Sequence, residues 1–440
     1  MKILIIATYF PPQNSVASLR PYSWAKYWSR AGHDVTVLTT RKHDHPTNTV
    51  YPYTGFAVRE VEMPFFNLLR GSLGKKSAEK YTDSKNMPKA KLRAFAVGVI
   101  NKMIQWLQTK YGVLNACRMP DLTDLWVEPA FQAVANERWD LVISSAWPYT
   151  VHRVAYKLRK AGIAKLWIAD WRDLWTENHL YPGIWPFTIF EKRSERFWMT
   201  VADFITTVSD PLALVLERKY GSKVSVIYNG FDPEDYENLP KERSFPQDGV
   251  FRIIYTGSVY ADKQDPSALF QAIARLHEAG HLSPHRLQII FYGNNADMRT
   301  LAKEMNIVDY VQYGGFLPRQ QVLHFQRDAD ALLFLEFKSD HVQGILTGKL
   351  FEYLFAGPPI LSVGIGSDMS ASTVLNATGR GGSFGENVDT LAQRIHELVD
   401  GKANGLERHL PVGEERRNSA VIQYSRKRQA EKLIGLVSDT

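Results

Sequence analysis

The strongest constraint on the fold is a β-loop-α-β unit between residues 331 and 363. Residues 331–335 (ALLFL) form a short apolar run typical of a buried strand, and residues 346–356 show the apolar spacing of a helix. Gly357 ends that helix, Pro358 prevents its continuation, and a second apolar run starts at Ile360. Two consecutive strands joined by a helix lie parallel in one sheet. The sequence therefore predicts an α/β protein.

The same alternation continues along the chain in two successive sets, separated by a polar, proline-bearing linker at residues 232–248. The predicted strands of the first set are residues 3–7, 34–39, 141–144, 166–169, 204–208 and 224–227, with helices at 17–30 and 150–160. The predicted strands of the second set are residues 251–256, 287–291, 311–313, 331–335 and 359–363, with helices at 266–278, 296–304, 320–327 and 390–398. We predict two doubly wound domains, residues 1–235 and 236–421.

Length and composition agree with two packed domains, because the chain has 440 residues of which 45% are hydrophobic. The single cysteine, Cys117, excludes an intramolecular disulfide and is compatible with a reducing compartment. About eight apolar residues follow Lys2 before Pro11, which is short for a signal peptide. No apolar run approaches the roughly 20 residues of a membrane-spanning helix. We expect a cytoplasmic protein that is soluble or peripheral on the membrane.

Two charged residues mark the start of the helix at 346–356. This helix begins at the carboxyl edge of the predicted sheet, where open α/β folds bind ligands. Lys349 lies in its first turn, where the helix dipole disfavours a cation by roughly 0.3–1 kcal/mol. A bound phosphate would reverse that preference, and Glu352, one turn later on the same face, would then accept hydrogen bonds from a ribose. A nucleotide site is one interpretation, and a solvated Lys349–Glu352 pair is the other.

Residues 349–361, KLFEYLFAGPPIL, resemble the K-L-x-E-Y-x-A-x-G-x-P segment of GT-B glycosyltransferases, in particular the group 1 or family 4 enzymes. Four further stretches match this family in the same order: MKILIIATYFPP with AGHDVTVLT at the start, ADWRDLW at 169–175, VIYNGFD at 226–232 and YTGSVYADK at 255–263. The resemblance implies two Rossmann-like domains that face each other across a cleft. It also implies that a C-terminal helix, within residues 422–440, returns to the first domain.

The resemblance assigns nucleotide-sugar binding to the second domain. The implied donor-binding residues are Gly257, Ser258, Lys263, Thr347, Lys349, Leu350 and Glu352, and the implied catalytic residues are His152, Lys263 and Lys349. Lys263 lies six residues after Gly257, the interval at which the family places a lysine that contacts the diphosphate. Two positions depart from the family. Ser258 replaces the usual arginine, and Gly344 replaces the first of two glutamates eight positions apart, which leaves the donor sugar and the stereochemistry open.

Polar residues of the first domain are candidates for the acceptor side. Asp170, Arg172 and Asp173 directly follow an apolar strand and thus lie at the rim of the predicted crevice. They either contact a substrate or form an ion-pair network that shapes the loop. Asn14 lies in the loop after the first strand, where many relatives have paired glycines. His152 matches a family position near the reacting sugar, although a lone histidine is more often structural.

These residues predict a transferase that moves a sugar from a nucleoside diphosphate sugar to an acceptor. Backbone N–H groups with Lys263 and Lys349 would stabilise the charge on the leaving phosphate. No D-x-D motif stands at a strand end, so we expect no metal and no cofactor, and the resemblance implies retention of the anomeric configuration. The alternative is a non-catalytic GT-B relative that binds a nucleotide sugar or scaffolds a partner enzyme. The glutamate and arginine missing at Gly344 and Ser258 support that alternative.

Residues 65–110 carry ten Lys and Arg residues against Glu79 and Asp83, followed by an apolar helical stripe. A basic amphipathic segment suits an anionic membrane face. This favours a peripheral enzyme of polysaccharide biosynthesis that extends a lipid-linked glycan or glycolipid. The alternative is an ordinary loop followed by a core-packed helix. A net charge of +7 over 440 residues is too diffuse to indicate nucleic acid, so no nucleic-acid partner is expected.

Overall fold

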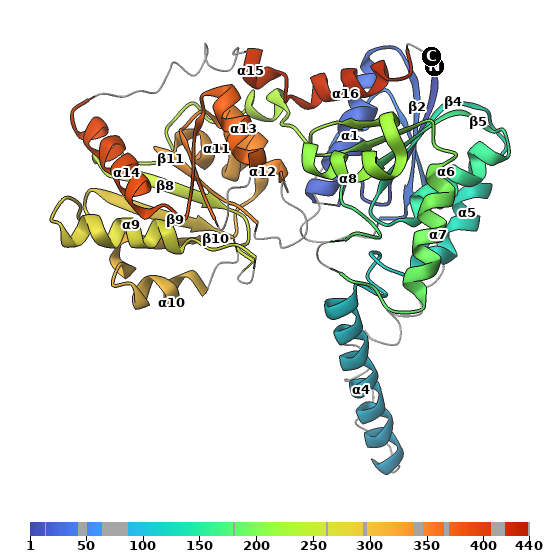
Figure 1. Ribbon diagram of the computed structural model, residues 1–440, viewed down its shortest axis with the longest axis horizontal. Coiled ribbons are helices and arrows are strands. Elements are labelled where there is room, and N and C mark those ends of the chain that lie inside the picture. Colours follow the sequence, from blue (N-terminus) through green and yellow to red (C-terminus); the bar gives the residue numbers. More distant parts are fainter. Residues whose placement is uncertain are drawn as a thin grey trace. The chain divides into compact units, whose positions relative to one another are not determined.

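The computed structural model describes residues 1–13, 15–42, 51–63, 87–178, 181–260, 263–293, 297–337, 346–364, 369–405 and 419–438, without the side chains of 16, 87–97, 297 and 369–370. Internal contacts divide the chain into two compact units (Figure 1). The first comprises Met1–Val208, Leu212–Ile227 and Lys432–Thr440, and the second comprises Ser209–Pro211 and Tyr228–Glu431. The domain boundary after residue 235 stays a prediction.

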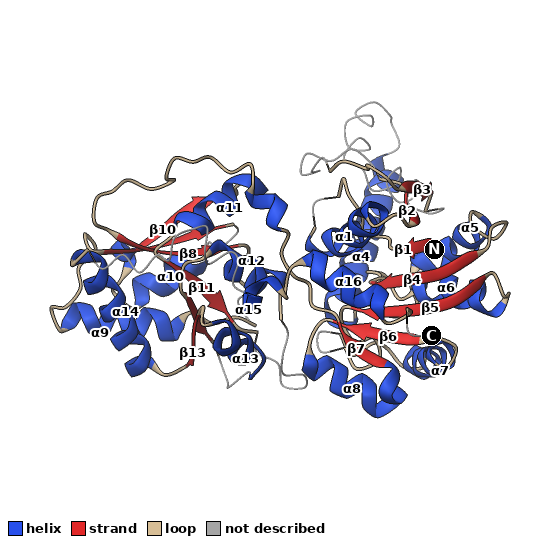
Figure 2. Ribbon diagram, turned by 90° about the horizontal axis from the view of Figure 1, so that it is seen from above, coloured by secondary structure: helices blue, strands red, loops and turns tan. Residues whose placement is uncertain are grey.

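The first unit contains a seven-stranded sheet in the order β3-β2-β1-β4-β5-β6-β7, and all neighbouring strands run parallel (Figure 2). Its strands are β1 (Lys2–Ile6), β2 (Asp34–Thr40), β3 (Ala57–Val61), β4 (Trp139–Ala146), β5 (Ala164–Trp171), β6 (Phe204–Thr207) and β7 (Val224–Val226). In chain order, the helices between and after these strands are α1 (Val16–Arg30), α4 (Met87–Tyr111), α5 (Val127–Gln132), α6 (Thr150–Lys160), α7 (Phe187–Met199) and α8 (Asp210–Tyr220). Figure 1 shows α4 as a helix that projects away from this sheet.

The second unit contains a six-stranded sheet in the order β10-β9-β8-β11-β12-β13, again entirely parallel. Its strands are β8 (Phe251–Thr256), β9 (Leu287–Tyr292), β10 (Val311–Gly315), β11 (Ala331–Leu335), β12 (Ile360–Val363) and β13 (Gly381–Gly385). The helices are α9 (Ser267–Glu278), α10 (Asp297–Glu304), α11 (Arg319–Asp328), α12 (Gly348–Ala356), α13 (Met369–Thr378), α14 (Val388–Ala403) and α15 (Ser419–Ile422). The last helix, α16 (Arg426–Gly435), begins in the second unit and ends in the first, which its residues join from Lys432 onward.

Alternate residues of the central strands build two hydrophobic cores in the second unit, one on each face of the sheet. Ile253 and Tyr255 of β8 pack in the core that also contains buried residues of α9 and α14. Ile254, between them in sequence, packs in the opposite core with buried residues of α12. This period of two follows from the pleat of a strand. Because both faces are covered, β8 has apolar residues on both faces, with Arg252 as its one charged residue, and this pattern identifies the strand in the sequence.

The predicted fold class is confirmed: the protein is α/β with two doubly wound parallel sheets. Two strands were not predicted. The β13 sequence, GGSFG, has little strand propensity, and β3 has no fully buried residue. Within the described residues, no helix combines the length and the apolar composition needed to cross a bilayer.

Each sheet has a switch point, where the chain changes from adding strands on one side of the first strand to adding them on the other. In the first unit this point lies between β1 and β4, and in the second it lies between β8 and β11. Loops that leave neighbouring strands in opposite directions open a crevice at the carboxyl edge, and ligands of such folds bind there. In the second unit, the loop after β8 and the helix after β11 lie at this edge.

Candidate functional site

Lys349 lies in the first turn of α12, beside the switch point of the second sheet. Its Nζ atom stands 3.9 Å from the centroid of the Tyr255 ring, and Tyr255 is fully buried. Among the described residues, none accepts a hydrogen bond from this ammonium or forms an ion pair with it. Burial lowers the pKa of Lys349 to about 7, and the nearby Glu352 carboxylate opposes that shift only in part. The site thus holds a desolvated cation that a bound anion would stabilise.

Two glycines keep the space beside Lys349 open. Gly257 follows β8 with a φ of +108°, and a Cβ atom there would lie 3.1 Å from the Lys349 Nζ. Gly293 follows β9 with a φ of +118°, and its Cβ atom would lie 2.5 Å from the carbonyl oxygen of Gly257. A side chain at either position would be strained and would meet a neighbour. The two loops therefore approach each other closely and present backbone rather than side chains to this crevice.

The N-terminus of α12 supplies further unsatisfied donors. Thr347 is the N-cap residue, yet its side chain makes no capping hydrogen bond, and its Oγ1 atom is buried with no hydrogen-bond partner in the described structure. The first N–H groups of a helix have no acceptor within the helix. Such N–H groups together with the helix dipole favour a phosphate. Thr347, the helix terminus and Lys349 therefore form one candidate anion site.

Glu352 lies one turn after Lys349 and is held by two arginines. Its Oε1 atom stands 2.9 Å from Nη1 of Arg319 and 3.8 Å from Nη2 of Arg426. Both arginines also pair with Asp235, at 2.8 Å and 3.6 Å. Arg319 thus fixes one carboxylate oxygen, while no described residue donates to Oε2. The solvated Lys349–Glu352 pair considered from the sequence is wrong, because Lys349 is desolvated and the direct ion partners of Glu352 are arginines.

The other predicted donor residues occupy different environments. Gly257 and Ser258 are exposed, and the Ser258 carbonyl accepts a hydrogen bond from the Tyr255 hydroxyl at 3.0 Å. Lys263 is half-buried, and no described contact joins its ammonium to Lys349. Leu350 is fully buried in a core, and its N–H donates to the Thr347 carbonyl at 3.2 Å. A side-chain role for Leu350 in donor binding is therefore corrected: this side chain faces the core.

Three residues of this region were missed from the sequence: Tyr255, Gly293 and Arg319. Gly293 had a usable signal, since it is a glycine directly after an apolar strand, as Gly257 is. Tyr255 and Arg319 had none. They reach Lys349 and Glu352 only through the tertiary fold, and no local pattern carries that information.

In the first unit, Asp170 is the centre of a buried network. Its carboxylate accepts hydrogen bonds from Arg20 at 2.7 Å and 3.1 Å, from Ser145 at 2.7 Å and from Thr206 at 2.8 Å. Burial would raise the pKa of Asp170, but the Arg20 guanidinium and these hydrogen bonds outweigh it and hold the pKa below its usual value. Arg20 also donates to the Ile227 carbonyl at 2.7 Å. Of the two interpretations for Asp170, the structure shows the ion-pair network, because these partners surround the carboxylate and the residue is 0% exposed.

Arg172 and Asp173 remain at the sheet edge. The Arg172 guanidinium donates to the carbonyls of Ala146 and Trp147, and it lies 5.5 Å from the centroid of the Tyr9 ring. Asp173 is half-buried, and no side-chain partner for it is found in the described part of the chain. Asn14 lies outside the described residues. Arg172 thus lies beside the loop after β1, and the acceptor-side role of Arg172 and Asp173 stays a prediction.

His152 lies in α6 and has no exposed surface. Its Nδ1 atom stands 2.7 Å from Oγ of Ser144, whose Oγ also accepts a hydrogen bond from Trp167 at 2.8 Å. The Trp171 ring centroid is 4.0 Å from that of His152. Burial lowers the pKa of His152 to about 3, so the ring is neutral at pH 7. The described structure places the ring in the core beside Trp167 and Trp171, and the catalytic role of His152 stays a prediction.

The described residues contain no group of three or more His, Cys, Asp or Glu side chains arranged to hold a metal ion. Two doubly wound sheets, with an anion site at the switch point of the second, are the features of GT-B glycosyltransferases. The resemblance to this class is confirmed at the level of the fold and, over part of the chain, at the level of sequence.

Residues 106–235 match the family profile Glycosyltransferase Family 4. The chain is also 28% identical over 183 residues to a 2-deoxystreptamine glucosyltransferase of Streptomyces kanamyceticus. That match covers 39% of this chain and spans 45% of the relative, less than half its length.

Solved structures show the same fold over the entire chain. A sucrose-phosphate synthase from Thermosynechococcus elongatus superposes with a TM-score of 0.61 and 12% identity, covering 100% of this chain and 98% of the other. A trehalose-6-phosphate protein from E. coli, bound with UDP-2-fluoro glucose, superposes with a TM-score of 0.58 and 11% identity, covering 99% of this chain and 98% of the other.

Proposed function

We propose that this protein is a glycosyltransferase that uses a nucleoside diphosphate sugar as donor and needs no metal ion. The observation that carries the proposal is the Lys349 ammonium, which is desolvated and has no anionic partner in the described structure. It lies where Gly257, the Thr347 hydroxyl and the N-terminus of α12 converge. The donor complex of the E. coli structure and the glucosyltransferase name of the curated relative support the same ligand class.

Different residues would bind different parts of the donor. Lys349, Thr347 and the helix N–H groups would hold the diphosphate, with Lys263 as a second cation when its loop contacts the ligand. The Oε2 atom of Glu352 would accept hydrogen bonds from the ribose while Arg319 holds the Oε1 atom in place. This arrangement fixes the direction of the Glu352 carboxylate. Arg319 is a positioning residue in this scheme because it acts on the ribose only through Glu352.

The reaction is a substitution at the anomeric carbon. The bond from that carbon to the diphosphate oxygen breaks, its electron pair stays on the leaving oxygen, and Lys349 with the helix N–H groups stabilises the charge. The acceptor hydroxyl oxygen forms the new bond to carbon, and its proton passes to the departing phosphate when attack occurs on the same face. This route retains the anomeric configuration. It uses no cation other than those of the side chains.

A thermal-shift series with nucleoside diphosphates and their sugars tests donor binding. A ligand at 100 times its Kd stabilises the folded state by about 2.7 kcal/mol. We expect Lys349→Met to abolish this shift and Lys303→Met, an exposed lysine of α10, to leave it unchanged. Equal shifts for wild type and Lys349→Met would show that the donor site lies elsewhere.

Release of nucleoside diphosphate separates the enzyme from a non-catalytic relative that only binds a nucleotide sugar or scaffolds a partner. The residues that support the latter are Ser258 and Gly344, and Gly344 lies outside the described residues. A protein that shows the thermal shift but never releases nucleoside diphosphate, with any lipid-linked, glycan or free-sugar acceptor, would favour the alternative.

The acceptor side belongs to the first unit, where Arg172 and Asp173 offer polar atoms. We place the protein on the cytoplasmic face of a membrane, where it extends a lipid-linked glycan or a surface polysaccharide. Of residues 65–110, the stretch 64–86 lies outside the described residues, whereas residues 98–110 form a helix with exposed apolar and basic side chains. Sedimentation with anionic vesicles at low salt tests this location, and binding equal to that on neutral vesicles would contradict it.

A further inference from the structure

Helix α7 of the first unit has an inverted distribution of charge and apolar surface. Its two acidic residues point inward: Glu191 is 0% exposed and Glu195 is 2% exposed. Trp198 and Met199 at its end are buried, but Phe190 and Phe197 point outward, at 54% and 57% exposed. A surface helix ordinarily buries its apolar stripe and exposes its charges. Packing within this unit therefore does not explain why the exposed side of α7 is apolar.

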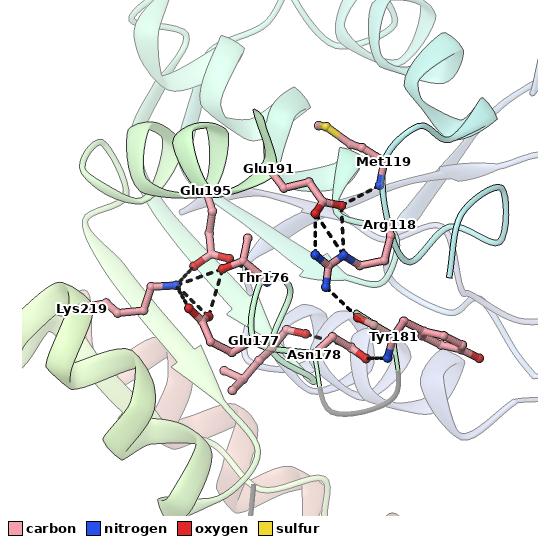
Figure 3. A network of polar contacts seen from close by, with 10 residues as sticks. Arg118, Met119, Thr176, Glu177, Asn178, Tyr181, Glu191, Glu195 and Lys219 are labelled. Atoms are coloured by element: carbon pink, nitrogen blue, oxygen red, sulfur yellow. Dashed lines mark hydrogen bonds and ion pairs between the residues drawn. The ribbon is translucent and has the colours of Figure 1, made fainter. Parts of the chain in front are cut away.

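Basic partners neutralise both glutamates, the buried Arg118 for Glu191 and Lys219 for Glu195 (Figure 3). Glu191 pairs with the buried Arg118 at 2.6 Å and accepts a hydrogen bond from the Met119 N–H at 2.7 Å. Glu195 pairs with Lys219 and accepts hydrogen bonds from the Thr176 N–H at 3.0 Å and the Tyr220 hydroxyl at 2.7 Å. Removing Glu191 would leave the buried Arg118 without its carboxylate, whereas Lys219 also pairs with Glu177 at 2.8 Å. Both acidic residues of α7 are thus buried, and no acidic residue of this helix is exposed.

The exposed surface of α7 is apolar and positively charged. The outer face of α7, as defined here, consists of exposed residues from the loop before the helix and from the helix itself: Trp185, Ile189, Phe190, Lys192, Arg193, Arg196 and Phe197. Trp185 is 77% exposed. Between residues 184 and 200 the only acids are the two buried glutamates. Large aromatic side chains interleaved with Lys and Arg are the composition of helices that lie at a bilayer surface.

The same surface chemistry continues on α4. Val99, Ile100, Met103 and Trp106 are exposed on this helix. Its 25 residues include Lys89, Lys91, Arg93, Lys102 and Lys110 and no Asp or Glu. Lys110 lies 5.3 Å from the ring centroid of Trp106, so a cation and an exposed aromatic ring are already adjacent. Both helices therefore present apolar and basic groups without acidic ones.

A buried junction fixes α4 and α7 to each other. The last residue of α4, Tyr111, accepts a hydrogen bond at its carbonyl from the Gly183 N–H at 3.2 Å. Arg118 donates to the Tyr181 carbonyl at 2.7 Å and pairs with Glu191 of α7. Figure 3 shows Arg118 between these two partners. The Arg118–Glu191 pair thus connects the end of one exposed helix to the start of the other, within one unit.

We infer that the outer face of α7 is a second contact surface for an anionic lipid bilayer, which acts together with α4. This rests on the membrane location proposed above and names the surface that produces it. A protein partner fits less well, because protein interfaces are depleted in lysine, and the exposed surfaces of the two helices carry Lys192 on α7 and Lys102 and Lys110 on α4. Headgroup phosphates would pair with the cations, while Trp185, Phe190 and Phe197 enter the interfacial layer.

Vesicle partitioning of the full chain tests the inference, with phosphatidylcholine alone and with about one third phosphatidylglycerol. Arg193→Ser with Arg196→Ser should lower the partition coefficient on anionic vesicles by about 30-fold, since each cation near the surface contributes about 1 kcal/mol. Phe190→Ser with Phe197→Ser should lower it by on the order of tenfold or more. The matched controls are Leu214→Ser, an exposed apolar residue of α8, and Lys303→Ser, and both should bind as wild type.

A second measurement locates the contact. Bromine on the acyl chains should quench wild-type tryptophan fluorescence more than that of Trp185→Phe. The thermal shift with nucleoside diphosphate, measured without vesicles, should be unchanged in every α7 variant, so a failed donor site and a failed membrane surface give different results. Wild-type binding by both double variants would overturn the inference. So would a dimer in sedimentation analysis that the double phenylalanine variant abolishes while vesicles bind nothing.

Discussion

Lys349 makes donor binding depend on pH in a defined direction. Burial lowers its pKa from 10.5 to about 7, so the unliganded protein holds a neutral amine over most of the alkaline range. A diphosphate that needs the ammonium binds only the protonated fraction, and the apparent Kd rises as that fraction falls. Two pH units above the pKa, at pH 9, about 1% of the amine is protonated. The nucleoside diphosphate should therefore bind on the order of 100-fold more weakly at pH 9 than below pH 7.

The same shift has a consequence for stability. A fall of about 3.5 in pKa corresponds to about 4.8 kcal/mol at 1.36 kcal/mol per unit. Since the unfolded chain binds more protons than the folded one between pH 7 and 10.5, stability without ligand should rise across that window. Lys349→Met removes the ammonium. It should stabilise the unliganded protein at pH 7 by about 2–4 kcal/mol, the lower value allowing for the part of the side chain that stays in water.

Isothermal titration calorimetry from pH 6.5 to 9 measures the first effect, and urea unfolding measures the second. Lys349→Arg is the matched control, because an arginine stays charged throughout and should flatten the pH dependence. If wild-type affinity is constant from pH 7 to 9, and if Lys349→Met neither stabilises the free protein nor weakens binding, the reasoning about the desolvated ammonium is wrong.

Three further changes test individual residues. Glu352→Gln should weaken a ribonucleoside diphosphate by about 1–3 kcal/mol in calorimetry and leave inorganic pyrophosphate unchanged, and equal losses for both ligands would remove the ribose assignment. Asp170→Asn leaves Arg20 buried without its counter-ion and should cost about 3–5 kcal/mol in urea unfolding, whereas Asp173→Asn should change stability by about 0.5 kcal/mol or less. His152 has a pKa of about 3 when folded, so acid protonates the unfolded chain first, and wild type should lose up to about 2.7 kcal/mol of stability between pH 7 and 4.5. His152→Gln should lack that slope, and an unchanged slope would mean that the ring is accessible.

Local patterns in the sequence were sufficient to predict most of the strands. The strands β8 and β11 coincide with the predicted ranges 251–256 and 331–335, because strands covered on both faces have apolar residues on both faces and so stand out in the sequence. The position of Lys349 followed equally from local signals, namely a strand, a helix start and the Gly357 stop. Each of these features depends on residues close in sequence. The local chain therefore carries the information needed to locate them.

Local patterns in the sequence could not predict that the acidic face of α7 is the buried one. A periodic pattern shows that a helix has two different faces, and the hydrophobic effect ordinarily decides which one is buried. Here the decision depends on Arg118, 73 residues before Glu191 in the chain, and on Lys219, 24 residues after Glu195. Asp170 and Arg20 are 150 residues apart and are equally invisible to local analysis. Partners this distant become neighbours only when the sheet has formed.

The two units share a strand order, and their charges indicate which one binds the anion. Near the carboxyl edge of the first sheet, Asp170 accepts two hydrogen bonds from Arg20 and one each from Ser145 and Thr206. A ligand there would have to compete with protein groups for these partners. At the switch point of the second sheet, the Lys349 ammonium has lost water and gained no anion from the described residues. A phosphate in that place would relieve an existing desolvation cost, which is why we propose the second unit as the one that binds the nucleoside diphosphate.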